Sequence, residues 1–397
     1  MSSSSREVQS VGYQLYESEL RGFAPGEVLE LRVGDELDWD PVADEIEELM
    51  LFLIGSRPKV KFSKTASNPT KVKRLEFAQP VSTVSLFSGG LDSGAFAVWL
   101  GGQEPYSLLA HTETSKIMYG KARRFRSGFV GGGVRMVTFR AKSENQQWGM
   151  INTRGVVFLT NAIAVANELS ARRVVVPENG PMMLNIPVSS QVQSSKTANP
   201  RMIATWTAIV NHALGANISV ETPYADMTKA EIIRGLRDPD AMAHTYSCFS
   251  SQGQSRMCGL CLACFVRIAS CYAASLPEDV EATYIHNPFA DSLSELGDVN
   301  QGKAITITEA LDFWATLAEP DAEDVPRRRE RAERITKKWP VMRRHALDIM
   351  LGARGYIEAG GRCDGQVGTA ALEVLGRINP RLLDKRKDEL SRMQEQA

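Results

Sequence analysis

An apolar segment that runs directly into a glycine-rich turn constrains this chain more than any other feature. Residues 84–93 read VSLFSGGLDS, and the sequence continues as a helix-like DSGAFAVWLGG. A strand, a turn and a helix in this order bring backbone N–H groups and the positive end of the helix dipole to one point, where an anion binds. The stretch therefore predicts a phosphate-binding loop. The alternative is a tight strand-to-helix turn with Asp92 as the helix N-cap.

Each residue type in this loop suits a contact that a phosphate needs. Gly89 and Gly90 let the backbone approach the anion, and Ser88 and Ser93 offer hydroxyl donors. Asp92 fits such a site if it caps the loop's own amides or helps to hold Mg²⁺, the usual neutraliser of phosphate charge. The chain has no GxxxxGK[ST] motif, so its predicted chemistry differs from that of P-loop kinases and motors.

Composition and charge exclude several classes of protein. The 397 residues are 43% hydrophobic and 23% charged, which suffices for a sizeable core divided into two or three domains. A formal net charge of -1 gives no reason to expect a nucleic acid as the main partner. The polar N-terminus MSSSSREVQS has no signal-peptide core, and no window approaches a membrane span. We therefore expect a cytoplasmic protein without membrane association.

Strand-like and helix-like segments alternate in the middle of the chain, which predicts an α/β fold with a parallel sheet and helices on both faces. The strand-like segments are VSTVSLF, YSLLAHTET, VRMVTFRA, RRVVVPENG and ISVETP. We expect residues 81–289 to form this domain. Residues 1–80 are predicted to be a small α+β extension, and residues 290–397 a helical C-terminal domain.

Local patterns mark further boundaries. SKTASNPTKVKR, before the central domain, is interpreted as a linker or hairpin. The sequence TKAE is a capping box, in which Thr228 and Glu231 satisfy each other's backbone amides, so a helix should begin at Lys229. In the C-terminal region, residues 325–357 are interpreted as one helix. The basic residues of this segment, with the interleaved Glu330 and Glu333, are expected to form a solvated helix face; the alternative is a basic surface for tRNA.

Four of the six cysteines lie close together, with the spacing C-x9-C-x2-C-x2-C. They are Cys248, Cys258, Cys261 and Cys264. Two overlapping CxxC steps let three thiolates converge and the distant fourth close a tetrahedron, which predicts a structural Zn²⁺ site. Buried free thiols, a redox couple and a catalytic zinc are the alternatives. Cys271 and Cys363 stand apart and are expected to be core thiols.

Three motifs in this order resemble known families. FSGGLDS after an apolar strand resembles the PP-loop of the ATP pyrophosphatases, which hold the pyrophosphate end of ATP and transfer AMP to a substrate oxygen. VETPYADMTKAEI and YSCFSSQGQSRMCGLCLACFVR resemble segments of QueC, the 7-cyano-7-deazaguanine synthase family, and the likeness runs from residue 81 to about residue 275. The resemblance implies that ATP phosphates bind Ser88, Gly89, Gly90, Leu91, Asp92 and Ser93.

The resemblance also implies a catalytic set. Lys229, at the matching KAE position, is predicted to neutralise phosphate charge during adenylyl transfer. Arg154 matches the arginine that opens a helix at the same place in the family, and Asp92 completes the set. The simpler interpretation of Lys229 and Arg154 is that both are solvated residues.

The substrate segments differ from those of the family. DxSGYPDC is replaced by PENGPMMLNIPVSS, where Glu178 and Asn179 are the candidates to read a guanine-like edge. DYGQ is replaced by HTETSK, where His111 is expected to be a packing or hydrogen-bonding residue and not a catalyst. With these changes and its extensions, the chain resembles the enlarged QueC-like proteins of bacterial anti-phage gene clusters.

That resemblance implies ATP-dependent activation of a 7-deazaguanine carboxylate and its transfer to an amine. The implied amine is the N-terminus of a partner protein from the same gene cluster. The alternatives are a conventional synthase that uses ammonia, a tRNA-modifying PP-loop enzyme, and a non-catalytic scaffold that senses nucleotides.

Overall fold

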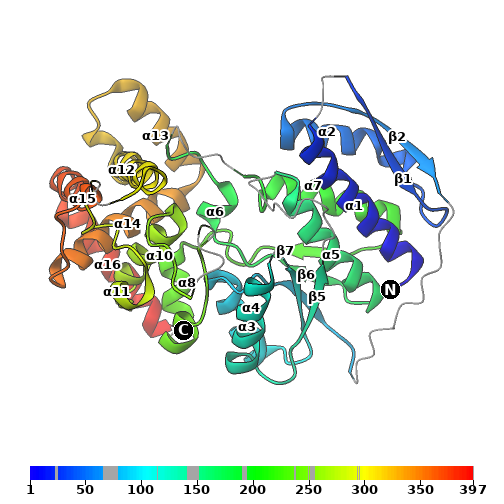
Figure 1. Ribbon diagram of the computed structural model, residues 1–397, viewed down its shortest axis with the longest axis horizontal. Coiled ribbons are helices and arrows are strands. Elements are labelled where there is room, and N and C mark those ends of the chain that lie inside the picture. The colour runs from blue at the N-terminus through cyan, green and yellow to red at the C-terminus, as the bar shows by residue number, and fades with distance from the viewer. Residues whose placement is uncertain are drawn as a thin grey trace.

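The protein, described by a computed structural model, has a central sheet covered by helices and two flanking regions at opposite ends (Figure 1). The N-terminal elements lie at one end and the C-terminal helices at the other, with the sheet between them. The structure describes residues 1–22, 26–65, 79–113, 115–140, 152–189, 195–236, 238–248, 250, 255–292, 294 and 296–396.

The described part of the chain forms a five-stranded parallel sheet with strand order β5-β4-β3-β6-β7. Its strands are β3 (Thr83–Leu86), β4 (Leu108–Glu113), β5 (Arg135–Arg140), β6 (Arg173–Val175) and β7 (Ser219–Glu221). From β3 the chain moves outward through β4 and β5, then crosses back to β6 and β7. A crevice opens beyond the carboxyl ends of the strands at such a reversal. The SGGLDS turn follows β3 at this point.

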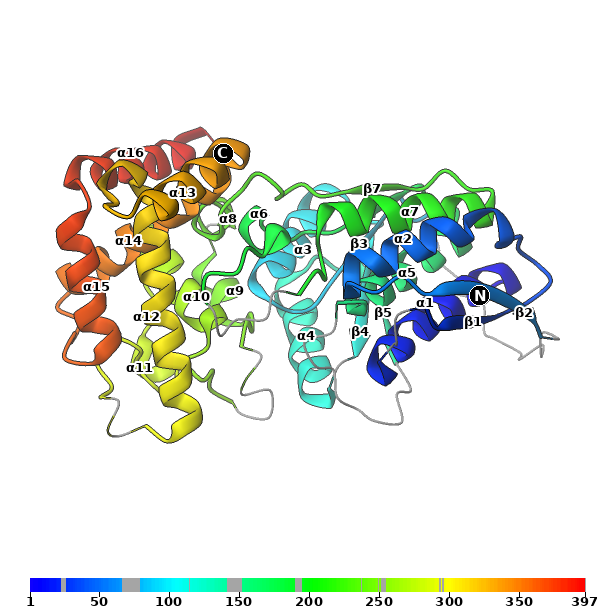
Figure 2. The same cartoon turned by 90° about the horizontal axis from the view of Figure 1, so that it is seen from above.

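Helices cover both faces of the sheet because successive strand residues point to opposite sides. Leu108 and Val174 join one core cluster, while Leu109 and Val175 join another. The first cluster includes α5 (Arg154–Glu168) and α7 (Pro200–Leu214), and the second includes α3 (Leu91–Gln103) and α4 (Lys116–Phe129). Figure 2 shows the helices on either side of the strands. The predicted α/β fold is confirmed.

The helix α4 has no counterpart among the predicted segments. Its sequence KIMYGKARRFRSGF buries only Ala122 and Phe125, so its apolar periodicity is too weak to stand out. Shorter helices complete the central region. They are α6 (Gly180–Leu184), α8 (Lys229–Leu236), α9 (Pro239–Ala243), α10 (Leu262–Ala273) and α11 (Val280–Thr283).

The N-terminal region has the predicted mixture of helices and strands. It contains α1 (Ser3–Arg21), β1 (Val28–Val33), the 3-10 turn η1 (Asp40–Val42), α2 (Ala43–Ile54) and β2 (Lys59–Lys64), with β1 and β2 paired in parallel. Its apolar residues share the core cluster of α5 and α7. Gly12 of α1 lies so close to α5 that a Cβ there would be 2.6 Å from Thr160 Oγ1. Most of the expected linker SKTASNPTKVKR, residues 66–74, lies outside the described residues.

The C-terminal region is helical, as the sequence predicts. It contains α12 (Asp298–Ala318), the 3-10 turn η3 (Pro320–Ala322), α13 (Pro326–Lys338), α14 (Pro340–Glu358), α15 (Gln366–Arg377) and α16 (Pro380–Gln396). The single helix expected over 325–357 is wrong. The helix is interrupted at Trp339. Pro340 cannot donate the backbone hydrogen bond of a helix interior, and it begins α14 instead.

The apolar cores do not follow the predicted domain boundaries. One cluster joins the cysteine-rich segment and α10 to the C-terminal helices, and another joins the N-terminal region to the sheet. The boundaries near residues 80 and 290 therefore stay a prediction. Across the ranges described above, no helix is both long enough and apolar enough to traverse a lipid bilayer.

Candidate active site

The SGGLDS turn is shaped by its own glycines and hydroxyls. Gly89 has φ +79°, and a Cβ there would lie 3.2 Å from Ala122 of α4. Ser88 Oγ accepts from the Gly90 amide (3.2 Å), and Ser93 Oγ accepts from the Ser88 amide (3.2 Å). Gly90 is the N-cap of α3, so the alternative that Asp92 caps this helix is wrong. The result is a compact strand–turn–helix unit with its amides at the open end of the sheet.

Asp92 connects three segments that are far apart in the sequence. Its side chain is buried. Its Oδ1 accepts from Lys229 Nζ at 2.5 Å and its Oδ2 from Asn179 Nδ2 at 2.6 Å. We expected Asp92 to cap the amides of its own loop. Its side chain instead contacts Lys229 of α8 and Asn179 in the segment after β6. The alternative interpretation of Lys229 as a solvated residue is wrong, because its side chain is buried and forms an ion pair with Asp92.

The helix that carries Lys229 begins as predicted. The Thr228 amide donates to Glu231 Oε2 (2.8 Å), and the Glu231 amide donates to Thr228 Oγ1 (3.2 Å). These reciprocal bonds confirm the capping box. Lys229 is the first residue of α8, so the cap fixes the backbone from which its side chain reaches Asp92.

The positive charge of Lys229 acts on two carboxyl groups, those of Asp92 and Glu178. Burial opposes ionisation of Asp92, but Lys229 and the hydrogen bonds from Glu178 and Asn179 outweigh it, and the pKa of Asp92 lies below its usual value. Burial and repulsion by Asp92 raise the pKa of Glu178 well above its usual value. Of the two carboxyl groups, Asp92 is therefore the one that ionises first as pH rises, and Glu178 keeps its proton to a higher pH.

We expect the Glu178→Gln variant to gain stability relative to the natural protein as pH rises. A folded-state pKa above the unfolded value means that the stability contributed by Glu178 is complete below pH 4.5 and is lost as pH rises toward the folded pKa. Within that window the difference should grow by up to about 1.4 kcal/mol for each pH unit. Melting temperatures of both proteins at about pH 5 and about pH 8 measure it. A difference that stays constant with pH would contradict the raised pKa.

Asn179 lies beneath the cavity and not on its open surface. It is 1% exposed. Its amide nitrogen donates to Asp92 and to Glu178 Oε1 (3.2 Å), and its Oδ1 accepts from the Met182 amide (3.1 Å), capping α6. The amide that was predicted to read a base is thus engaged within the protein, and Glu178 is the member of the pair that lines the cavity.

Arg154 opens α5 on the other side of the cavity. Its Nη2 donates to Thr197 Oγ1 (3.3 Å), while its buried Nε has no partner among the described residues. Burial lowers the pKa of Arg154, although Tyr16 and Glu178 oppose this effect. The N-terminal helix α1 also supports this turn, because Glu19 accepts from the amides of Asn152 (2.9 Å) and Thr153 (2.7 Å).

We expect Glu19→Ala to lower the free energy of unfolding by about 2 kcal/mol, because three donors at the start of α5 lose a charged acceptor. The third donor is Thr153 Oγ1, at 2.6 Å. Urea unfolding followed by circular dichroism provides the measurement. Glu17→Ala, at an exposed position of the same helix, is the matched control and should change the value by less than about 0.5 kcal/mol. Equal effects of the two substitutions would contradict this role for Glu19.

A cavity of about 360 Å³ lies at the carboxyl end of the sheet. The predicted site residues that line it are Ser88, Gly90, Leu91, Asp92, Ser93, Arg154, Glu178, Lys229 and Cys248. Gly89 and Asn179 lie behind this surface. Apolar residues from α5 and α7 form much of the opposite wall, including Phe158, Leu159, Met202 and Ile203. The tertiary structure thus brings together the SGGLDS loop, which is predicted to bind an anion, the cations Lys229 and Arg154, and an apolar wall that suits a flat ring.

His111 and Tyr246 line the same cavity without having been predicted to do so. His111 Nδ1 donates to the Phe87 carbonyl (2.8 Å), which leaves Nε2 as an unprotonated nitrogen. Burial lowers the pKa of His111 and keeps the ring neutral. The Tyr246 amide donates to the Gly89 carbonyl (3.0 Å), and Lys121 Nζ lies 3.0 Å from the centre of its ring. No motif marks these contacts, because each joins residues distant in the sequence.

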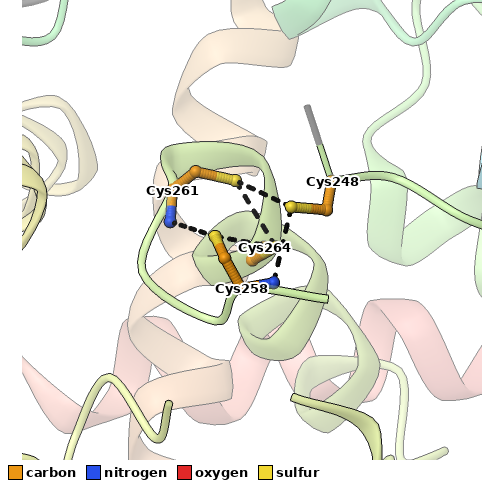
Figure 3. A group of neighbouring side chains, drawn as sticks. All are labelled: Cys248, Cys258, Cys261 and Cys264. Atoms are coloured by element: carbon orange, nitrogen blue, oxygen red, sulfur yellow. Dashed lines mark hydrogen bonds between the residues drawn. The ribbon is translucent and has the colours of Figure 1, made fainter. Parts of the chain in front are cut away.

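The four clustered cysteines point toward one another (Figure 3). All four are buried, and their sulfur atoms lie within 4.8 Å of one another. Tetrahedral Zn–S bonds of about 2.3 Å place the sulfurs about 3.8 Å apart. The Sγ distances are 3.4 Å for Cys261–Cys264, 3.9 Å for Cys258–Cys264 and 4.0 Å for Cys248–Cys261. The donor set therefore fits zinc.

The cysteine cluster also connects the cavity wall to the start of α10. Cys261 is the N-cap of α10, and its amide donates to Cys258 Sγ (3.2 Å). Cys248 lines the cavity beside Tyr246. The lone Cys271 is buried and Cys363 half-buried, and neither belongs to this cluster. A metal bound here would tie the cavity wall to α10.

Comparisons with known proteins agree with this geometry. Residues 125–274 match the family model described as "Queuosine biosynthesis protein QueC". The match contains Arg154, Glu178, Asn179, Lys229 and the four cysteines, and it begins after the SGGLDS loop.

Several curated relatives carry the name "7-cyano-7-deazaguanine synthase". The protein from Acinetobacter baylyi is 26% identical over 214 residues, which cover 48% of this chain and 91% of that relative. The protein from Aromatoleum aromaticum is 26% identical over 228 residues, which cover 50% and 97%. The protein from Cupriavidus pinatubonensis is 36% identical over 85 residues, and the match spans only 20% of this chain and 38% of that relative. Together with the loop geometry after β3, these matches support a likeness of the chain to the QueC family of PP-loop proteins.

Proposed function

We propose that the protein is an ATP-dependent carbon–nitrogen ligase that adenylates a 7-deazaguanine carboxylate, such as 7-carboxy-7-deazaguanine. Pyrophosphate is released, and the acyl adenylate forms an amide with an amine. The observation that carries the proposal is the contact of Lys229 Nζ with Asp92, which is itself a residue of the SGGLDS loop. The names of the relatives support the substrate class.

In the proposed first step, an oxygen of the substrate carboxylate attacks the α-phosphorus of ATP. The new O–P bond replaces the bond to the bridging oxygen of the β-phosphate, and pyrophosphate leaves with that electron pair. The SGGLDS loop holds the departing anion through the hydroxyls of Ser88 and Ser93, which line the cavity, and through the backbone of its glycine turn. Lys229 moves from Asp92 toward the developing charge.

Charge neutralisation in this step also involves Asp92 and Arg154. Magnesium, which neutralises phosphate charge when bound, would be held by Asp92 together with phosphate oxygens. Arg154, on the opposite wall, is the candidate to hold a phosphate or the substrate carboxylate. Glu178, which lines the cavity, is the candidate to read a guanine-like edge through its carboxyl group.

In the proposed second step, a neutral amine attacks the acyl carbon, the bond to AMP breaks, and the amine loses a proton. The reaction needs no protein nucleophile, so positioning and charge stabilisation supply the rate. Zinc is proposed to be structural, since four thiolate ligands leave no coordination position for a substrate. The use of ATP and the four reduced thiols support a cytoplasmic location.

The proposed amine is the N-terminus of a partner protein in an anti-phage system. The sequence resemblance to enlarged QueC-like proteins supports this choice, and so does the unmatched length of the chain, because the family model ends at residue 274. A conventional synthase that uses ammonia is the second candidate, favoured by the names of the relatives.

The test is pyrophosphate release from magnesium ATP and 7-carboxy-7-deazaguanine, with product masses recorded. Three reactions are compared: substrate alone, substrate with ammonia, and substrate with a protein encoded by a neighbouring gene. A mass increase on the protein is the expected result, whereas a free nitrile identifies a conventional synthase. No release under any condition contradicts adenylation and favours a tRNA-modifying enzyme or a nucleotide-sensing scaffold.

A further inference from the structure

A buried cluster of charged side chains ties the C-terminal helices to the first turn of α8. Glu231 and Asp348 contribute the carboxylates, and Arg386 bridges them. Arg386 Nη2 donates to Glu231 Oε1 (2.6 Å), and its Nε donates to Asp348 Oδ1 (2.7 Å). Arg386 is 2% exposed and Asp348 is fully buried. One guanidinium therefore fixes α8, α14 and α16 relative to one another.

The cluster acts on the cap of α8 itself. Thr228 Oγ1 accepts the Glu231 amide and donates its own hydrogen to Asp348 Oδ2 at 2.5 Å. Glu231 uses Oε2 for the Thr228 amide and Oε1 for the two arginines Arg386 and Arg344. Both side chains of the capping box thus have a partner in the C-terminal region as well as within the box.

Lys229 follows this cap directly, and its ammonium lies 2.5 Å from Asp92. A lysine in the first turn of a helix is opposed by the helix dipole. The backbone at this position consequently needs support from outside the helix to keep the ammonium at the loop. The Thr228–Asp348–Arg386 contacts provide that support.

The supporting residues lie outside the part of the chain that matches the family. The QueC model ends at residue 274, whereas Asp348 and Arg386 belong to α14 and α16. The α8 segment lies inside the match, and its anchor lies in the additional helices. The C-terminal region therefore contacts the site through more than apolar packing.

We propose that Arg386 and Asp348 are positioning residues for Lys229, so that the C-terminal helices form part of the catalytic unit. This inference rests on the proposed function only for the role of Lys229 in adenylyl transfer. The contacts on Thr228 and Glu231 hold the first turn of α8 in the register that brings the Lys229 ammonium to Asp92. Loosening them moves the ammonium away from the loop without removing it.

The test uses Arg386→Lys in the full-length protein, because one ammonium keeps the charge but cannot bridge two carboxylates. We expect kcat for pyrophosphate release to fall by about 10–100-fold, with little change in KM for ATP. In a Lys229→Met background the same substitution should change kcat by less than about twofold, since its effect passes through Lys229. Equal losses in both backgrounds would overturn the positioning role. Arg377→Lys, at an exposed arginine paired with Asp312, is the matched control.

A second measurement does not require turnover. Brief acetylation with acetic anhydride, read by mass spectrometry, should modify Lys229 several times faster in Arg386→Lys than in the natural protein. Lys196, whose ammonium donates to the Phe52 and Leu53 carbonyls in the N-terminal part, should keep its rate and thereby report that the fold is intact. Unchanged labelling of Lys229 would overturn the inference even if the protein has another substrate. Failure of pyrophosphate release in the natural protein would instead contradict only the proposed function.

If Arg386→Lys does not fold, Thr228→Val replaces it. Valine keeps the shape of threonine but loses the hydroxyl that joins α8 to Asp348. We expect it to reproduce the loss of kcat and the faster labelling, and Thr228→Ser, which restores the hydroxyl, to rescue both. A valine variant that behaves like the natural protein would contradict the proposal.

Discussion

Replacing Lys229 with methionine is expected to slow pyrophosphate release by about 10²–10³-fold, because the SGGLDS loop loses the buried cation that pairs with Asp92. Methionine keeps the length and much of the apolar stem of lysine but carries no charge. The loss should appear mainly in kcat, since the ammonium is proposed to act on charge that develops in the transition state. Steady-state kinetics with magnesium ATP and 7-carboxy-7-deazaguanine provide the measurement.

The control for this substitution is Lys338→Met, which removes a lysine from the exposed end of α13 and should leave kcat unchanged. Removing Lys229 also leaves Asp92 without its ion pair. Asp92 can then share a proton with Glu178, so the fold should persist, which circular dichroism verifies. A Lys229→Met protein that releases pyrophosphate at the natural rate would exclude Lys229 from the chemistry.

The second large effect concerns the cysteine cluster. We expect one zinc per chain by elemental analysis, and we expect Cys261→Ser to abolish it and to lower the melting temperature by at least about 10 °C. The reason is that Cys261 contributes a ligand directly before α10, whose apolar face is shared with the C-terminal helices, so loss of the metal frees the start of that helix. Prolonged treatment of the natural protein with a strong chelator should produce the same shift.

Cys363→Ser is the matched control, because this half-buried thiol lies outside the cluster. It should retain zinc and melt close to the natural protein. A zinc content that is unaffected by Cys261→Ser would contradict the four-cysteine site. Loss of zinc without loss of stability would retain the site but remove its structural role.

Some features follow from short-range physical chemistry and can therefore be predicted from the sequence. The glycines and serines of SGGLDS define a strand-to-helix turn, since Gly89 needs a positive φ and the hydroxyls of Ser88 and Ser93 bond nearby amides. The capping box at Thr228 involves residues three apart. The cysteine spacing limits where the sulfurs can meet. In each case, the interacting groups are close in the chain.

Other features could not be predicted because their apolar or polar signals are weak or ambiguous. The helix α4 buries too few apolar residues to show a clear period. The segment 325–357 is strongly helical throughout, and its break depends on whether Pro340 bends a continuous helix or begins a new one. Asn179, a candidate to read a base, instead caps α6 and contacts Asp92, and that contact joins residues far apart in the sequence.

The sequence by itself determined the strand-to-helix turn SGGLDS, the start of α8 and the four-cysteine spacing, because neighbouring residues are sufficient to form each of them. Only the tertiary structure decided that Asp92, Lys229 and Asn179 meet beside one cavity, and that Arg386 holds the helix from which Lys229 projects. These contacts join residues separated by 87 to 155 positions. Their geometry depends on how whole helices pack on the sheet, which local propensity does not specify.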